Sequence, residues 1–352
     1  MKRFLFLLTV LISLPLLAQT EVNSFFSGAN EGVTYYLPDT EIEIKVNATC
    51  INRTPGEFNR YAERYLRIND VMTTAENYWE MTDIQVTTNG KPNVNKMYTI
   101  KLNGSTAGNI SLCKNGIIRG INITGNDTEE PENKQQASNR KPIDASQYMT
   151  EEMLQATSTA KLAELTAKEI FAIRESKLAI TRGLSESMPK DGQSMQLILD
   201  ELTKQEEALT ALFIGHSDTT YYSCTYKIEP TFGNDTTKAV LFRFSRKLGF
   251  VDKDDLAGEP VYYTLRDMKT VHIPTPEEIE KKKILKKEGV CYNIPGKAEF
   301  VIFTRNKKIT SNELGIAQFG VTEILSKDLF NKRAETKVTF DTATGGILSI
   351  EK

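Results

Sequence analysis

The sequence is poor in the residues that carry metal chemistry and disulfide frameworks. Among 352 residues there are 2 histidines, 1 tryptophan and 4 cysteines. The histidines form neither a His-Glu-x-x-His nor a His-x-x-Glu-His motif, and no Cys-x-x-Cys is present, so the sequence argues against a zinc site. The Gly-x-Ser-x-Gly elbow of α/β-hydrolases is also missing. We therefore predict no metal and no catalytic residue from motifs.

Excess charge and long apolar runs are lacking as well. The chain has 44 Lys and Arg against 46 Asp and Glu, with a pI of about 6.0. This balance excludes a protein that coats nucleic acid through a basic surface. Neither Gly-rich phosphate loop occurs, so we predict no nucleotide cofactor. After the first twenty residues no run of 18 apolar residues follows, and we expect no transmembrane segment in the mature chain.

The N-terminus has the three parts of a secretory signal peptide. Lys2 and Arg3 form a basic start, Phe4 to Leu14 is apolar, and Pro15 precedes a small residue at Ala18. The apolar run is too short to span about 30 Å of hydrocarbon comfortably. We therefore predict a signal peptide over residues 1–18 and export of the mature protein.

The rest of the chain predicts an α+β fold, with two mainly antiparallel β-rich units and a helical hairpin between them. Alternating apolar and charged residues over 41–46 indicate a strand, and Asn89-Gly90 and Asn115-Gly116 are typical of turns between strands. Residues 337–351 read as a closing β-hairpin. The predicted ranges are an N-terminal β-rich domain with one short helix (19–125), a polar linker (126–145), an antiparallel helical hairpin (146–216) and a C-terminal β-rich domain (217–352).

The helical range carries apolar residues at helical spacing, and Gly215 is expected to end its second helix. In that helix the apolar stripe comprises Met195, Ile198, Leu199, Leu202, Leu209, Leu212 and Phe213. We expect the two helices to bury their stripes against each other. The alternative is a seam between oligomer subunits.

The cysteines of an exported protein are able to form disulfides. If the two β-rich units fold separately, the natural pairs are Cys50–Cys113 and Cys224–Cys291. The alternative is that the four are small, buried, reduced side chains on strands.

Three further sets of residues are candidates for binding, catalysis or modification. Exposed aromatic rings stack on sugars or anchor protein partners, and the candidates here are Tyr61, Tyr65, Tyr78 and Trp79. A pair of carboxylates performs glycoside hydrolysis, and the candidates are Glu57, Glu63, Glu80 and Asp83. Asp-Thr-small or Asp-Thr-Thr segments are candidate O-glycosylation sites, at Thr219, Thr236 and Thr342.

Several segments along the mature chain resemble one family. They are Val33–Pro38, Pro55–Phe58, Tyr61–Leu66, Leu241–Ser245, Leu256–Pro260 and Ala317–Gly320. The chain is similar to an uncharacterised family of secreted proteins from Bacteroides-type Gram-negative bacteria, catalogued as domain of unknown function 4831. The resemblance implies an exported protein of a double-membraned cell, and we expect this protein in the periplasm or at the outer membrane. It supplies no activity and no site residues.

Together these features favour a non-enzymatic periplasmic or cell-envelope protein with a binding or structural role. Its partner would be an envelope protein or a glycan. The alternatives are a carbohydrate-active hydrolase that uses a carboxylate pair, and a carbohydrate-binding module built on the aromatic residues.

Overall fold

The computed structural model describes residues 32–100, 109–123, 144–184, 191–275, 277–278, 289–326, 329 and 336–351. Strands make up 50% of it and helices 24%, and the sheets are antiparallel. The α+β class predicted from the sequence is therefore confirmed. The predicted signal peptide and residues 126–143 of the predicted linker lie outside the described residues.

The helices are η1 (Asn59–Tyr61), α1 (Ala62–Leu66), η2 (Ala145–Tyr148), α2 (Glu151–Leu154), α3 (Thr159–Thr181) and α4 (Gly192–Ile214). The strands are β1 (Val33–Thr54), β2 (Glu76–Ile100), β3 (Ile110–Leu112), β4 (Ile118–Ile121), β5 (His216–Ile228), β6 (Thr236–Ser245), β7 (Gly249–Val251), β8 (Glu259–Asp267), β9 (Gly289–Phe303), β10 (Lys308–Ser326), β11 (Lys337–Phe340) and β12 (Ile347–Glu351). No helix among the described residues has both the length and the apolar character needed to cross a membrane.

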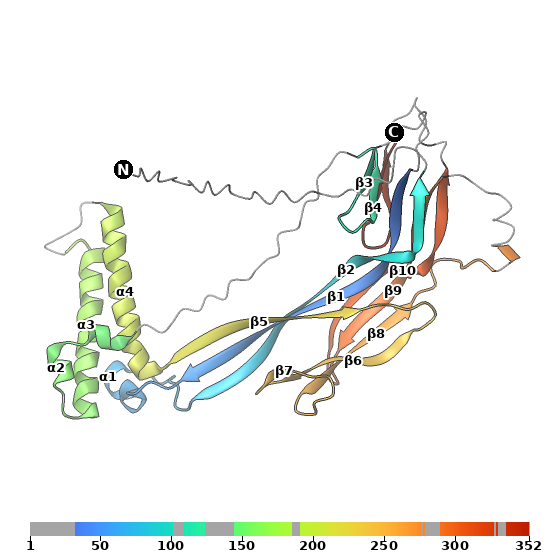
Figure 1. The fold of residues 1–352 in the computed structure, drawn as a ribbon. Coiled ribbons are helices and arrows are strands. Elements are labelled where there is room, and N and C mark those ends of the chain that lie inside the picture. Colours follow the sequence, from blue (N-terminus) through green and yellow to red (C-terminus); the bar gives the residue numbers. More distant parts are fainter. Residues whose placement is uncertain are drawn as a thin grey trace, which may run out of the picture.

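Strand β1 is the centre of a three-stranded sheet with the order β2-β1-β5. The predicted alternation is present, because Ile42, Ile44 and Val46 are fully buried whereas Glu43 and Lys45 between them are half-exposed. One face of the sheet is therefore apolar. Figure 1 shows that the three strands continue as a twisted ribbon, and that the helices lie at its far end.

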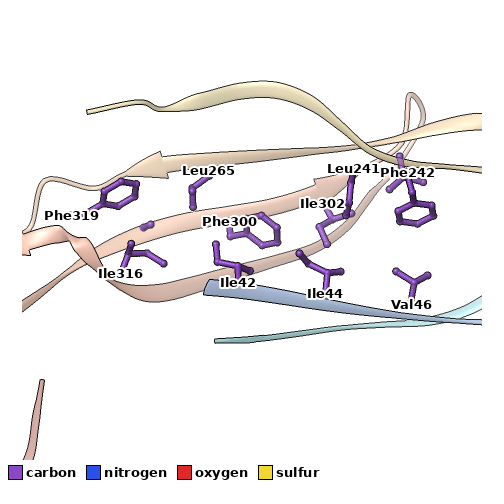
Figure 2. Packing of buried hydrophobic residues seen from close by; sticks show 12 residues of the cluster. Ile42, Ile44, Val46, Leu241, Phe242, Leu265, Phe300, Ile302, Ile316 and Phe319 are labelled. Carbon is purple, nitrogen blue, oxygen red and sulfur yellow. The ribbon is translucent and has the colours of Figure 1, made fainter. Parts of the chain in front are cut away.

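A five-stranded sheet of order β10-β9-β8-β6-β7 covers the apolar face of β1. Figure 2 shows Ile42 and Ile44 of β1 lying toward Phe300 and Ile302 of β9, with Phe242 of β6 beyond them. All five are at most 1% exposed. Burying each such side chain contributes about 1.5–3 kcal/mol, so this core is the main source of stability in the β-rich body.

A third sheet, of order β12-β11-β4-β3, pairs the C-terminal strands with strands of residues 110–121. Its core includes Tyr35 and Leu37 from β1 and Val290 from β9. Strands from range 19–125 and strands from range 217–352 therefore share sheets: β1 and β2 with β5, and β3 and β4 with β11 and β12. The domain limits stay a prediction, but the two β-rich ranges contribute strands to the same two sheets.

The predicted closing hairpin is present, with β11 paired to β12. Its connection, residues 341–346, packs into the body of the molecule. Asn293 is 1% exposed, and its Nδ2 donates to the carbonyl oxygens of Thr344 and Pro38, at 2.9 and 3.1 Å. Its Oδ1 accepts a hydrogen bond from the hydroxyl of Thr322 at 3.1 Å. One buried amide thus ties the connection to β1 and β10.

Only one of the two Asn-Gly dipeptides forms the predicted turn. Asn115-Gly116 forms the predicted turn, with Gly116 at a φ of +80°. The turn predicted at Asn89-Gly90 is wrong, because both residues lie inside β2, paired with β1. A Cβ atom on Gly90 would lie 1.9 Å from the carbonyl oxygen of Thr342. The glycine is required there by the close approach of the 341–346 connection.

The helical part has the predicted hairpin at its centre. Ser158 caps α3 and Asp191 caps α4, each by accepting a hydrogen bond from a backbone N–H in the first turn. Gly215 ends α4 with a φ of +86°, as expected. Ile170 of α3 and Phe213 of α4 are fully buried in a core that they share with α1. Residues 185–190 between the helices lie outside the described residues.

The base of the hairpin is bonded to the end of the ribbon. The backbone N–H of Phe58 donates to the carbonyl of Leu212 at 2.7 Å, and that of Met72 donates to Ile214 at 3.1 Å. A Cβ on Gly56 would lie 2.4 Å from the carbonyl oxygen of Leu212. This close backbone packing fixes the direction in which the hairpin leaves the ribbon.

Candidate interaction surfaces

The four predicted binding aromatics occupy two separate places. Tyr61 and Tyr65 lie on η1 and α1 with ring centroids 6.0 Å apart, and both pack against the helical core. Tyr78 and Trp79 are consecutive residues of β2, so their side chains leave opposite faces of the strand. The structure therefore forms no single flat platform from these four rings.

Trp79 is packed at the edge of the sandwich. Its ring lies 4.4 Å from that of Tyr222 on β5, and it covers Gly249, where a Cβ would come within 2.6 Å of the indole. Its backbone N–H donates to the carbonyl of Arg246 at 2.7 Å. Sequence reasoning did not single out Tyr222 as a partner, because the contact crosses β1 between strands distant in sequence.

Two guanidinium groups lie over the ring of Tyr78 on the other face of β2. The Cζ atom of Arg246 is 5.0 Å from the ring centroid and that of Arg53 is 5.5 Å away. Contacts of this kind contribute about 0.5–1 kcal/mol at exposed sites. These two contacts stabilise the junction of the ribbon with the β6–β7 turn.

The four candidate carboxylates are exposed. Glu57 and Glu63 lie in the segment around η1 and α1, whereas Glu80 and Asp83 lie on β2 opposite Thr49 and Asn47 of β1. The structure thus brings two of them to one strand and keeps the other two in the helical part. Among the described residues no group of three or more His, Cys, Asp or Glu is placed to hold a metal ion.

All four cysteines lie among the described residues, where they form no disulfide, and each is partly buried. Cys113 lies in the turn whose Gly116 carbonyl accepts a hydrogen bond from the N–H of Tyr36 near the start of β1. Cys50 follows Tyr36 by about 14 residues on the same strand, which corresponds to roughly 45 Å. A disulfide requires Cα atoms within about 7 Å, so this fold does not bring Cys50 and Cys113 together.

The two cysteines of the second expected pair lie beside distant positions along β1. Cys224 lies opposite Val46, whereas the N–H of Cys291 donates to the hydroxyl of Tyr35 at 2.8 Å. Val46 and Tyr35 are about 11 residues apart on the strand, or roughly 35 Å. The pairs were expected on the condition that the two β-rich units fold separately, and the shared sheets do not meet that condition.

The candidate glycosylation residues differ in exposure. Thr342 is exposed, in the connection between β11 and β12, whereas Thr219 and Thr236 are half-buried on β5 and β6. A glycan requires a surface position. Thr342 therefore has the most suitable surroundings of the three.

The distal half of the helical hairpin is the most apolar exposed part of the helical region. We define it as residues 174–184 and 191–207. Leu184 and Leu197 are 72% and 69% exposed, and Leu178 and Ile198 are 49% and 41% exposed. No residue of α3 beyond Ile173 is buried, and on α4 burial begins only at Ala208. Exposed apolar side chains concentrated in one part of a molecule are candidates for an interaction surface.

One ion-pair cluster joins the two helices at the start of this distal half. Glu206 of α4 accepts hydrogen bonds from Arg174 Nε at 2.6 Å and from Lys177 Nζ at 3.0 Å. Partial burial raises the pKa of Glu206, but the hydrogen bonds from Arg174 and Lys177 outweigh it, so the pKa is lowered overall. The carboxylate therefore stabilises the hairpin in its charged form.

We expect Glu206→Gln to lower the free energy of unfolding by about 1 kcal/mol at neutral pH. Because the folded-state pKa is depressed, this stabilisation is present above the unfolded pKa of about 4.3 and is lost as the pH falls through the folded value. The deficit should therefore shrink in urea titrations at about pH 3. Glu207→Gln, on the exposed next residue, is the matched control. An equal deficit at pH 3 and pH 7 would contradict the assignment.

The fold and its surfaces define an α+β protein in which a β-sandwich carries helices at the end of a β-ribbon. The family model described as domain of unknown function (DUF4831) matches residues 31–348, and the chain belongs to that family. Neither the curated proteins nor the solved structures contain a significant match to it.

Proposed function

We propose that the mature protein is exported and acts in the periplasm or cell envelope as a non-enzymatic binding or structural protein. In this proposal the distal half of the hairpin is the surface that it presents to a partner. The signal-peptide pattern of residues 1–18 supports export. The exposed apolar residues Leu184, Leu197 and Ile198 support the role of the hairpin, and they are the observation on which the proposal depends.

The arrangement of the elements suits such a role. Figure 1 shows the hairpin at the end of the β2-β1-β5 ribbon, away from the sandwich. Its base is bonded to the ribbon through Phe58 and Met72, whereas its distal half has no buried side chain. A fixed base and an exposed apolar end are what a presented binding element requires.

The two alternative functions have less support from the geometry. The candidate carboxylates are exposed and divided between two parts of the molecule. Of the candidate sugar-binding rings, Tyr78 is covered by Arg53 and Arg246, and Trp79 by Tyr222. We therefore retain the binding or structural role.

Export is tested by fractionating cells that express the full chain with a C-terminal tag. We expect the tagged protein in the periplasm or envelope fraction, with an N-terminus at residue 19. The same chain without residues 1–18 is the control and should stay in the cytoplasm. Recovery of the uncleaved chain in the cytoplasm would overturn the proposal.

The role of the hairpin is tested with a photo-crosslinking amino acid at Leu197 in intact cells. The control position is Leu256, which is 84% exposed in the loop between β7 and β8. We expect a polypeptide adduct at position 197 and none at position 256. Equal labelling at the two positions, or none at 197, would contradict a presented surface on the hairpin.

A further inference from the structure

The turn between β6 and β7 carries exposed cations beside an exposed apolar side chain. Ser245 pairs with Gly249, so Arg246, Lys247 and Leu248 form a three-residue hairpin loop. Gly249 closes the loop at a φ of +76°, as is common for hairpin loops of this length. Both cations are exposed, and Leu248 is 58% exposed. The loop therefore presents two positive charges and one apolar side chain to the surroundings.

The loop is bonded to the ribbon. The backbone N–H of Trp79 on β2 donates to the carbonyl of Arg246 at 2.7 Å, and the indole packs on Gly249. The Arg246 guanidinium lies over the ring of Tyr78, 5.0 Å from its centroid. The guanidinium of Arg53, near the end of β1, lies 5.5 Å from the same centroid. Segments distant in sequence thus place two guanidinium groups on one aromatic ring.

These guanidinium groups have no counter-ion in the part of the chain that the structure describes. Because both lie over one ring, their charges are separated by no more than about one Debye length, ~10 Å at 0.1 M salt. Neither group forms an ion pair, and neither does Lys247 in the adjoining loop. By contrast, Lys227 pairs with Glu41 at 2.8 Å and Arg266 pairs with Glu299 at 3.0 Å. Three unpaired cations in one place favour the binding of anionic groups.

Two carboxylates border this group of cations without pairing with it. Glu76 lies opposite Arg53 in the pairing of β1 with β2, and Glu80 is two residues from Tyr78. The Arg53 guanidinium lies over the tyrosine ring and forms no ion pair with Glu76. Its N–H groups therefore remain able to bind an oxyanion such as phosphate. Because the excess of positive charge is small, we expect binding to be sensitive to salt.

We propose that this part of the molecule docks on an anionic lipid surface, and we name it the basic patch. The basic patch comprises Arg53, Tyr78, Arg246, Lys247 and Leu248. The cations bind lipid phosphates, and Leu248 enters the boundary of the acyl chains. An exposed apolar side chain beside the cations favours a lipid surface over a soluble anion, because a membrane offers phosphates next to hydrocarbon. The Tyr78 ring is also of a type that is enriched at membrane–water interfaces.

This inference goes beyond the proposed function, because it adds a second contact that does not involve the hairpin. Cosedimentation of the purified mature chain with vesicles tests it. The vesicles contain phosphatidylcholine with about 30% phosphatidylglycerol, and vesicles of phosphatidylcholine alone are the lipid control. We expect binding to the anionic vesicles at low salt, at least about tenfold weaker binding to the control, and loss of most binding at about 0.5 M salt. A chain that binds neither, or both equally, would overturn the proposal.

Three substitutions locate the contact on the molecule. Arg53→Gln and Arg246→Gln each remove one charge, and each should weaken binding to the anionic vesicles about fivefold. Leu248→Ser removes the side chain that enters the lipid and should weaken binding at least about tenfold. Unaltered binding by all three variants would show that the basic patch is not the contact.

Matched controls come from other exposed positions. Arg266→Gln removes an arginine that is paired with Glu299 on the sandwich, and Leu348→Ser removes a leucine that is 68% exposed on β12. Neither should change binding to the vesicles. The fluorescence of Trp79 in urea checks that every variant is folded. Losses as large for the controls as for the basic patch would contradict the proposal.

Inorganic phosphate distinguishes a lipid surface from a soluble oxyanion. We expect phosphate to displace the chain from vesicles no better than chloride does at the same ionic strength, because the lipid contact includes Leu248. If phosphate displaces the chain at millimolar concentration and L248S binds like the unaltered chain, the ligand is a soluble anion and the proposal is wrong. These measurements use the purified chain. Failure to bind vesicles would therefore leave the proposed role of the hairpin standing, and a failed crosslink at Leu197 would not alter the vesicle result.

Discussion

Replacing Phe300 with alanine is expected to lower the free energy of unfolding by about 3–5 kcal/mol. Phe300 is fully buried on β9, between the two sheets of the sandwich. It lies beside Ile42 of β1 in Figure 2, and its ring centroid is 5.8 Å from that of Tyr263 on β8. Truncation removes the apolar area of the ring and leaves a cavity that neighbouring strands cannot close.

The measurement is urea unfolding followed by the fluorescence of the single tryptophan, Trp79, which packs on Gly249 at the sandwich edge. The matched control is Phe232→Ala, because that ring is 60% exposed between β5 and β6. Its effect should stay within about 0.5 kcal/mol. Equal shifts for the two variants would show that the sandwich core is not where the structure places it.

Replacing Asn293 with leucine should lower the free energy of unfolding about as much as Phe300→Ala does, although leucine is of similar size and adds apolar surface. The amide makes three hydrogen bonds, and their loss leaves the carbonyls of Pro38 and Thr344 and the hydroxyl of Thr322 without this partner. Each unsatisfied buried group costs about 1–3 kcal/mol. We expect a total loss of about 3–5 kcal/mol in the same unfolding measurement.

A graded series makes this prediction specific. Thr322→Val removes one of the three hydrogen bonds and should cost about 1 kcal/mol. Asn234→Leu, at an exposed turn between β5 and β6, should cost less than about 0.5 kcal/mol. If N293L is as stable as N234L, the amide does not join the 341–346 connection to the rest of the fold.

Local patterns in the sequence predicted local structure well. The alternation over residues 41–46 identified the buried face of β1, and the ends of the helical hairpin followed from glycine and helical spacing. The non-local pairing was not predictable in the same way. Strand β5 pairs with β1 although the whole helical hairpin lies between them in sequence. No periodicity in one segment indicates which distant strand it will join.

The same limit explains the two predictions that depended on distant neighbours. Gly90 looks like a turn residue, but it is needed because the carbonyl of Thr342 lies close to it. The stripe of α4 looks like the core of a two-helix hairpin, and its buried residues Leu209 and Phe213 share their core with α1 as well as with α3. In both cases the residue type was informative, and its reason lay in another segment.

The continuity of β1 has a mechanical consequence. Its first residues are buried in the third sheet, its middle forms the sandwich core, and its last residues lead into the segment bonded to the base of α4. Tension between the sandwich and the helices would act along this strand, in shear against β2 and β5. Rows of backbone hydrogen bonds loaded in shear must break together rather than one at a time. We therefore expect the ribbon to transmit a pulling force between the sandwich and the helices without unzipping.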